Sequence, residues 1–162
     1  MEETNLATFD EESALKTTAE LLYEGTVKRM MSDRPIGTFL SGGLDSSVVA
    51  AFIKNYHRTN GMNTNLNTFS IGLEGSPDLA YSEIVAKHID STHHHVEVHM
   101  DDCLNALEDV IYQTETFDVT TVRASTPMYL LSKYVRENSD DVVIYSGEGS
   151  DEVTQGYLYF KK

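Results

Sequence analysis

The sequence contains a single cysteine, Cys103, among its 162 residues. One cysteine cannot form an internal disulfide, and no second cysteine is present for a zinc cluster or a two-cysteine redox motif. No stretch approaches the roughly 20 consecutive apolar residues that span a bilayer, and the first residues are acidic where a secretory signal is basic and then apolar. These absences predict a cytoplasmic protein that makes no contact with a membrane.

Basic residues are also scarce. Twelve Lys and Arg residues stand against 26 Asp and Glu residues, which gives a formal net charge of −14. Proteins bind nucleic acid largely by neutralising its phosphates with Lys and Arg, so this charge argues against a nucleic-acid partner. A small phosphate-bearing ligand is compatible with an acidic chain if oriented backbone amides, a divalent cation and a few placed basic residues hold it.

Apolar residues make up 40% of the chain, which is enough for one domain with a sizeable core. Short apolar runs predict strands at residues 36–40, 68–73, 95–98 and 142–145. Helical spacing predicts helices over residues 10–31, from residue 46, from residue 76, around residues 104–111 and around residues 128–135. Repeated strand-then-helix units predict an α/β fold with a doubly wound, mostly parallel sheet flanked by helices.

Three local expectations follow from the same patterns. The polar stretch 57–67 predicts a connecting loop. The helix that begins at residue 76 is expected to direct four side chains inward, those of Ala80, Ile84, Val85 and His88. The consecutive histidines 93–95 lie on a predicted strand, whose neighbouring side chains point to opposite faces, so they cannot chelate one metal together and surface positions are expected.

Residues 41–46, Ser-Gly-Gly-Leu-Asp-Ser, form a glycine-rich turn between a predicted strand and a predicted helix. Gly42 and Gly43 lack a Cβ, so the backbone can turn sharply and direct its N–H groups into a concavity that suits phosphate oxygens. The hydroxyls of Ser41 and Ser46 add donors, and the following helix presents its positive end. Asp45 would repel a polyphosphate unless a cation lies between them, which predicts a Mg²⁺ position. An ordinary capped turn is the alternative interpretation.

Residues 146–152, Ser-Gly-Glu-Gly-Ser-Asp-Glu, form a second glycine-rich turn after the strand at residues 142–145. Glu148 and Asp151 stand where an acid has no packing purpose, although a solvated acidic loop is the alternative. Ligands of open parallel sheets collect at the carboxyl ends of the strands, near a switch in strand order. We therefore expect both glycine-rich loops to face one site.

The string Ser-Gly-Gly-Leu-Asp-Ser, placed between a strand and a helix, resembles the signature of the PP-loop ATP pyrophosphatases, which have the adenine nucleotide alpha hydrolase-like fold. Residues 116–125 (Thr-Phe-Asp-Val-Thr-Thr-Val-Arg-Ala-Ser), residues 146–152 and residues 156–160 (Gly-Tyr-Leu-Tyr-Phe) resemble the synthetase domain of glutamine-dependent asparagine synthetases. This resemblance extends from about Phe9 to the last residue. It implies ATP and Mg²⁺ as cofactors, aspartate and ammonia as substrates, and a β-aspartyl-AMP intermediate formed with release of pyrophosphate.

The resemblance also implies roles for individual residues. The implied nucleotide-binding residues are Leu40, Ser41, Gly42, Gly43, Asp45, Ser46, Ile71, Ser146 and Gly147. Core packing is the alternative role for Leu40 and Ile71.

Three residues are candidates for the chemistry. Glu148 matches the family residue implicated in forming the adenylate, and it is a candidate base for ammonium. Asp151 matches a position where a carboxylate ligates Mg²⁺ or orients the aspartate ammonium, so the implied metal ligands are Asp45 and Asp151. Arg123 can offer a bidentate fork to the aspartate carboxylate or to pyrophosphate.

Two departures from the family pattern shape the functional expectation. Residue two is Glu2, where glutamine-dependent members carry a nucleophilic cysteine, and the family pattern continues past Lys162. Residues 1–162 are therefore expected to be the N-terminal part of a synthetase domain, without a glutaminase domain and with weak or no activity. The alternative is a non-catalytic module that binds nucleotide or associates with a full-length or complementary synthetase chain. A β-lactam-forming relative fits residues 116–125 and 146–152 less well.

Overall fold

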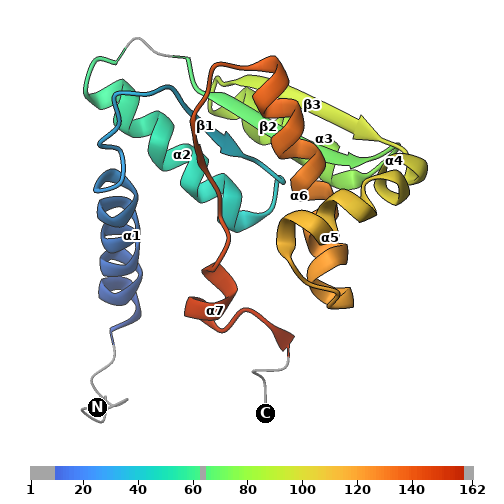
Figure 1. Cartoon of the computed structure of the whole chain (residues 1–162). Coiled ribbons are helices and arrows are strands. Elements are labelled where there is room, and N and C mark those ends of the chain that lie inside the picture. The colour runs from blue at the N-terminus through green and yellow to red at the C-terminus, as the bar shows by residue number, and fades with distance from the viewer. Residues whose placement is uncertain (1–9, 63–64, 159–162) are drawn as a thin grey trace.

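A four-stranded parallel sheet forms the centre of the protein (Figure 1). The computed structural model describes residues 10–62 and 65–158. The strands are β1 (Ile36–Phe39), β2 (Asn67–Leu73), β3 (Thr92–Val98) and β4 (Val143–Tyr145). Their order is β3-β2-β1-β4, and each neighbouring pair is parallel. The predicted parallel α/β sheet is confirmed.

Helices cover both faces of this sheet. They are α1 (Glu11–Val27), α2 (Leu44–Thr59), α3 (Pro77–His88), α4 (Met100–Asn105), α5 (Leu107–Thr114), α6 (Val119–Asn138) and α7 (Ser150–Thr154). On one face, α2 and α3 share the buried cluster of Leu40, Ala50, Ala86 and Ile89. On the other face, α6 packs on β2 through Phe69, Leu131 and Val135. No helix within the described ranges is long and apolar enough to cross a membrane.

The direction of the chain across the sheet reverses next to β1. From β1 the chain passes through α2 to β2 and through α3 to β3, and it then returns past both strands to place β4 on the other side of β1. The strand order therefore switches between β1 and β4. In an open parallel sheet, the loops at the carboxyl ends of two such strands diverge and leave a crevice. Both glycine-rich loops leave the sheet at this point.

The predicted loop at residues 57–67 is wrong at both of its ends, because α2 continues to Thr59 and β2 begins at Asn67. The buried residues of α2 are Ser46, Ala50, Ile53 and His57, which recur at helical spacing. His57 is only 5% exposed, so the helix buries an imidazole that the pattern treated as a loop residue. A histidine has an apolar body and can continue a buried stripe when its nitrogens are accommodated.

The inward face predicted for α3 is also largely wrong. Ala80, Ile84 and His88 are exposed, and Val85 alone of the four packs against the core. The buried residues of α3 are Leu79, Ser82 and Ala86. Two of these are small because α3 lies very close to the first glycine-rich loop, where a Cβ on Gly42 would come within 2.5 Å of the Ser82 nitrogen. Because the backbones of α3 and the first glycine-rich loop lie so close together, the buried face of α3 has room for small side chains where the pattern predicted large apolar ones.

The predicted surface position holds for His95 but is wrong for the other two histidines of β3. The His94 ring stacks on Phe69 with ring centroids 4.8 Å apart, on the face that α6 covers. The His93 ring points to the opposite face and hydrogen bonds to hydroxyls of β2. The three imidazoles do not converge, and the described part of the chain holds no group of three side chains suited to a metal ion.

Candidate functional site

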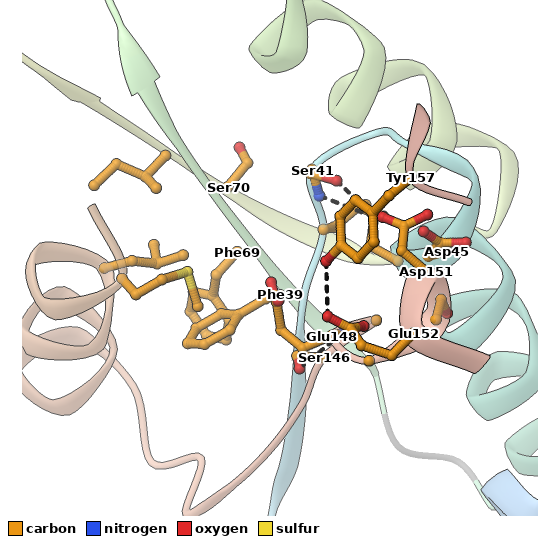
Figure 2. A pocket seen from close by; sticks show the side chains of 18 residues that line it. Phe39, Ser41, Asp45, Phe69, Ser70, Ser146, Glu148, Asp151, Glu152 and Tyr157 are labelled. Atoms are coloured by element: carbon orange, nitrogen blue, oxygen red, sulfur yellow. Dashed lines mark hydrogen bonds between the residues drawn. The ribbon is translucent and has the colours of Figure 1, made fainter. Parts of the chain in front are cut away.

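A pocket of about 210 Å³ opens at the switch point between β1 and β4. Its walls come from the carboxyl ends of β1 and β2, from the two glycine-rich loops, and from α6 and α7. The lining residues are Phe39, Leu40, Ser41, Asp45, Ser46, Phe69, Ser70, Ile71, Met128, Leu131, Ser146, Gly147, Glu148, Gly149, Ser150, Asp151, Glu152 and Tyr157. Apolar side chains of the strands and α6 lie on one side, and acids lie on the other (Figure 2).

The first loop is held in shape by its own hydroxyls. The Ser41 and Ser46 hydroxyl oxygens are 2.9 Å apart, and the Ser41 N–H donates to Ser46 Oγ at 3.2 Å. The Gly43 N–H donates to Ser41 Oγ at 3.2 Å. Gly43 is the N-cap of α2 and no side chain caps this helix end. The first N–H groups of α2 thus lack the usual side-chain acceptor, which is the arrangement that anions use at a helix N-terminus.

Gly42 has a structural role behind the pocket. Its φ is +82°, a conformation that favours glycine, and an added Cβ would lie within 2.7 Å of both the Tyr81 Cβ and the Tyr81 carbonyl carbon. Neither Gly42 nor Gly43 lines the pocket itself. Gly42 instead lets the loop rest directly on α3.

Gly147 brings the second loop against the first. A Cβ at this position would lie 2.6 Å from the Ser46 nitrogen and 2.8 Å from the Asp45 carbonyl carbon. Both are backbone atoms of the first turn of α2, so they cannot move aside as a flexible side chain would. The absence of a side chain at Gly147 is therefore what allows the two loops to meet at one pocket, as predicted from their positions after β1 and β4.

Four carboxylates face the pocket, those of Asp45, Glu148, Asp151 and Glu152. Figure 2 shows Asp45, Asp151 and Glu152 grouped around Tyr157. The Tyr157 hydroxyl donates to Glu152 Oε1 at 2.7 Å, and this hydrogen bond lowers the pKa of the Glu152 carboxyl. No lysine or arginine among the described residues lines the pocket. The site is therefore acidic within an acidic protein.

Asp45 and Asp151 are suited to hold Mg²⁺ together with a polyphosphate. Mg²⁺ is usually bound by one or two carboxylates, with substrate phosphates and water completing its shell. Asp45 lies in the first turn of α2 and Asp151 in α7, and both line the same pocket. Gly156 packs against Asp151, since a Cβ there would overlap Asp151 Oδ1 at 1.9 Å. Two carboxylates in one pocket are the kind of donors that Mg²⁺ prefers.

The structure gathers most of the predicted site residues in this pocket. Those that line it are Leu40, Ser41, Asp45, Ser46, Ile71, Ser146, Gly147, Glu148 and Asp151. Their individual roles stay predictions. The predicted motif at residues 156–160 is only partly visible, because residues 159–160 lie outside the described residues.

Arg123 is the predicted catalytic residue that the structure does not bring to the pocket. It is exposed on α6 and lines a neighbouring apolar groove, which also includes Cys103 and shares Ile71 with the lining of the pocket. Asp118 is the N-cap of this helix, and its side chain accepts a hydrogen bond from the Thr121 N–H at 2.7 Å. The threonines at residues 120–121 lie in the first turn of α6.

Sequence reasoning missed several pocket residues. Met128 and Leu131 come from α6, which crosses the sheet from the other side, and no local pattern connects them to the glycine-rich loops. Ser70 was detectable in principle, because it precedes Ile71 on β2. Tyr157 lies within the motif at residues 156–160, where only a family resemblance gave it meaning.

The arrangement of two loops at the switch point defines a class of fold. The chain aligns with an NH3-dependent NAD synthetase from Campylobacter jejuni at a TM-score of 0.52 and 19% identity, over 92% of this chain and 61% of that one. It aligns with the U34-tRNA thiolase NcsA from Methanococcus maripaludis at a TM-score of 0.56 and 21% identity, over 91% and 50% of the two chains. These likenesses show the PP-loop α/β fold.

Sequence comparison identifies the family within that class. The Asparagine synthase family model matches residues 17–162, so the chain belongs to the asparagine synthase family. It is 52% identical over 149 residues to the asparagine synthetase [glutamine-hydrolyzing] of Bos taurus, and the aligned region is 91% of this chain and 27% of that protein. The chain thus spans about a quarter of the length of the curated relatives it matches.

Proposed function

We propose that this chain binds ATP with Mg²⁺ between its two glycine-rich loops, as part of a ligase that adenylates the side-chain carboxylate of aspartate. The contact of Gly147 with the first turn of α2 is the observation that carries this proposal. It joins a loop suited to phosphate with a loop that supplies acids, at the position where open α/β sheets bind ligands.

The nucleotide would use both sides of the pocket. Backbone N–H groups at the start of α2 and the hydroxyls of Ser41 and Ser46 can donate to the phosphate oxygens. Leu40 and Ile71 offer apolar surface to the adenine ring at the strand ends. Bound Mg²⁺ would offset the charge between the phosphates and the pocket acids, with Asp45 and Asp151 as its ligands.

The proposed chemistry has two steps. An oxygen of the aspartate side-chain carboxylate attacks the α-phosphorus of ATP, the bond to the leaving pyrophosphate breaks, and β-aspartyl-AMP forms. Ammonia then attacks the activated carbonyl carbon and AMP leaves, which gives asparagine. Glu148 lines the pocket. We assign it to both steps: it would take part in forming the adenylate, the role of the family residue that it matches, and it would accept the proton that ammonium must lose to become a nucleophile.

In this proposal Arg123 binds the acceptor amino acid. It lies outside the pocket and lines a groove that shares the residue Ile71 with the pocket. A guanidinium there would bind the acceptor amino acid through a carboxylate, and would not bind the nucleotide. Its loss should therefore affect the aspartate-dependent step alone.

A second candidate function is a non-catalytic one. The neighbouring groove carries several exposed apolar side chains, among them Phe117 at 86% and Leu104 at 57% exposure. An exposed apolar face of this kind favours association with another protein segment, such as a full-length or complementary synthetase chain. In that case the chain would bind ATP without performing adenylation.

ATP–pyrophosphate exchange distinguishes the two functions. The purified chain is assayed with and without aspartate and Mg²⁺, beside Glu148→Ala and a control variant Glu24→Ala, which removes an exposed acid of α1. The catalytic proposal predicts aspartate-dependent exchange that Glu148→Ala abolishes and Glu24→Ala retains. A folded chain that binds ATP and shows no exchange with aspartate would contradict it and favour the non-catalytic function.

A further inference from the structure

A histidine joins three elements directly behind the candidate nucleotide site. His93 of β3 places Nδ1 2.8 Å from Thr68 Oγ1 and Nε2 3.1 Å from Ser70 Oγ, so its ring spans two hydroxyls of β2. The same Nε2 lies 3.4 Å from Ser82 Oγ of α3. Thr68, Ser70 and Ser82 are 3% exposed or less. The imidazole is thus enclosed by hydroxyls of β2 and α3.

Two of these hydroxyls belong to residues that shape the site. Ser70 lines the pocket between the two loops. Ser82 lies where α3 supports the first loop, since a Cβ on Gly42 would come within 2.5 Å of the Ser82 nitrogen. His93 therefore contacts both a wall of the pocket and the helix on which the phosphate-binding loop rests, without touching the pocket itself.

The hydrogen bonds indicate how the imidazole is protonated. Ser82 Oγ donates its hydrogen to the Leu79 carbonyl oxygen at 2.9 Å, so its oxygen can only accept from His93. This places a hydrogen on Nε2 of the neutral ring and leaves Nδ1 to accept from the Thr68 hydroxyl. In this arrangement the Nε2 hydrogen is shared between the Ser70 and Ser82 oxygens, and Nδ1 accepts from the Thr68 hydroxyl. Protonation at Nδ1 would force the Thr68 hydroxyl to turn away toward Ser91 Oγ, 3.0 Å distant.

We propose that His93 is a positioning residue for the nucleotide site, which fixes Ser70 and α3 relative to each other and thereby sets the conformation of the loop at Gly42. The inference rests on the proposed binding of ATP by this loop. It concerns a residue that lies outside the pocket and acts through β2, which lines the pocket at Ser70, and through α3, on which the first glycine-rich loop rests.

The surroundings of His93 favour its neutral form. The pKa of His93 is lowered, and burial is the largest cause. The neighbouring His95 and His94 lower the pKa further, whereas the Glu83 carboxylate on α3 raises it. The contacts on β2 are uncharged hydroxyls. Acid should therefore disturb the network that holds the loop.

Two substitutions test the inference. His93→Leu keeps an apolar body and removes all three hydrogen bonds, whereas His93→Gln keeps one group that donates and one that accepts. The affinity for ATP with Mg²⁺ is measured by calorimetry at a temperature where each variant is folded. Because the loop is then no longer held in one conformation, His93→Leu should bind ATP about tenfold more weakly or worse. His93→Gln should recover most of that loss.

The matched control is His95→Gln, which removes an exposed imidazole of the same strand. It should leave the affinity at about pH 8 unchanged, where His93 is least affected by protonation. The wild-type affinity should also decline as the pH falls from about 8 to about 5.5, and the decline should be smaller in His93→Gln, which has no imidazole to protonate at this position. A purely structural histidine would change the unfolding temperature without changing either affinity readout.

The outcomes separate this inference from the function on which it rests. If the folded wild-type chain does not bind ATP, the proposed function fails and the inference fails with it. If the wild type binds and a folded His93→Leu variant binds within twofold, only the positioning role is overturned. Should His93→Leu fail to fold, an identical pH profile in the wild type and His93→Gln overturns it.

Discussion

Replacing Gly147 with alanine tests the contact that joins the two loops. The new Cβ would lie 2.6 Å from the Ser46 nitrogen and 2.8 Å from the Asp45 carbonyl carbon. Real Cβ atoms do not approach other atoms so closely, so the second loop and the first turn of α2 must separate. Forcing an extra methyl group into a packed site costs about 1–3 kcal/mol of unfolding free energy. For a chain of this length, that corresponds to a midpoint roughly 2–12 °C lower.

The effect on ligand binding should exceed the effect on stability. Separation of the loops moves the N–H groups of α2 away from the acids that would share Mg²⁺, so the affinity for ATP with Mg²⁺ should fall in Gly147→Ala at a temperature where the variant is folded. Thermal unfolding followed by circular dichroism and binding followed by calorimetry measure the two effects separately.

Gly25→Ala is the matched control. Gly25 lies within α1, and an added Cβ would meet nothing within 4 Å. Alanine favours the helix by about 0.5–1 kcal/mol over glycine, so this variant should be as stable as the wild type or slightly more stable, with unchanged binding. If Gly147→Ala behaves like Gly25→Ala in both measurements, the contact between the loops does not organise the site and the reasoning is refuted.

Three further predictions follow from single residues. Burial, and to a smaller extent Lys54, lowers the pKa of His57, so the unfolded chain binds a proton there more readily than the folded chain does. The unfolding free energy should therefore decrease as the pH falls below about 6.5. Denaturant titrations should show a less steep decrease in His57→Gln. Asp45→Asn should raise the Mg²⁺ concentration needed for half-maximal ATP binding severalfold in calorimetric titrations; an unchanged requirement would exclude Asp45 as a ligand. Arg123→Ala should retain the ATP affinity and lose aspartate-dependent pyrophosphate exchange, and a loss of ATP affinity would place Arg123 at the nucleotide instead.

The fold was predictable where local pattern and burial agree. The strands that became β1, β2 and β4 are short apolar runs between turn signals, and a parallel sheet buries such runs on both faces. Both glycine-rich loops follow strands, and the carboxyl ends of parallel strands share one edge, so their meeting was also predictable. Element ends were less accurate, since α1 ends at Val27 and the helix expected around residues 104–111 divides into α4 and α5.

The errors at α3 and β3 have physical causes that cannot be read from local sequence pattern. Ser82 is buried because Gly42 brings the first loop onto α3, a contact between residues 40 positions apart in the chain. His93 and His94 are half-buried on opposite faces of the sheet, because the His93 ring hydrogen bonds to hydroxyls of β2 and the His94 ring stacks on Phe69. The catalytic role of Arg123 was assigned by motif alone and stays a prediction; the structure shows only that Arg123 lies on α6 and lines a neighbouring groove.

Amide chemical-shift mapping tests the central claim most directly, namely that the two glycine-rich loops form one site for ATP and Mg²⁺. ATP with Mg²⁺ is titrated into the isotopically labelled chain, and the shift of each backbone amide signal is followed. The account predicts saturable shifts at residues 41–46 and 146–151 together, with little change along the apolar groove beside Arg123. Shifts confined to one loop, shifts centred on the groove, or no saturable change in the folded chain would contradict it.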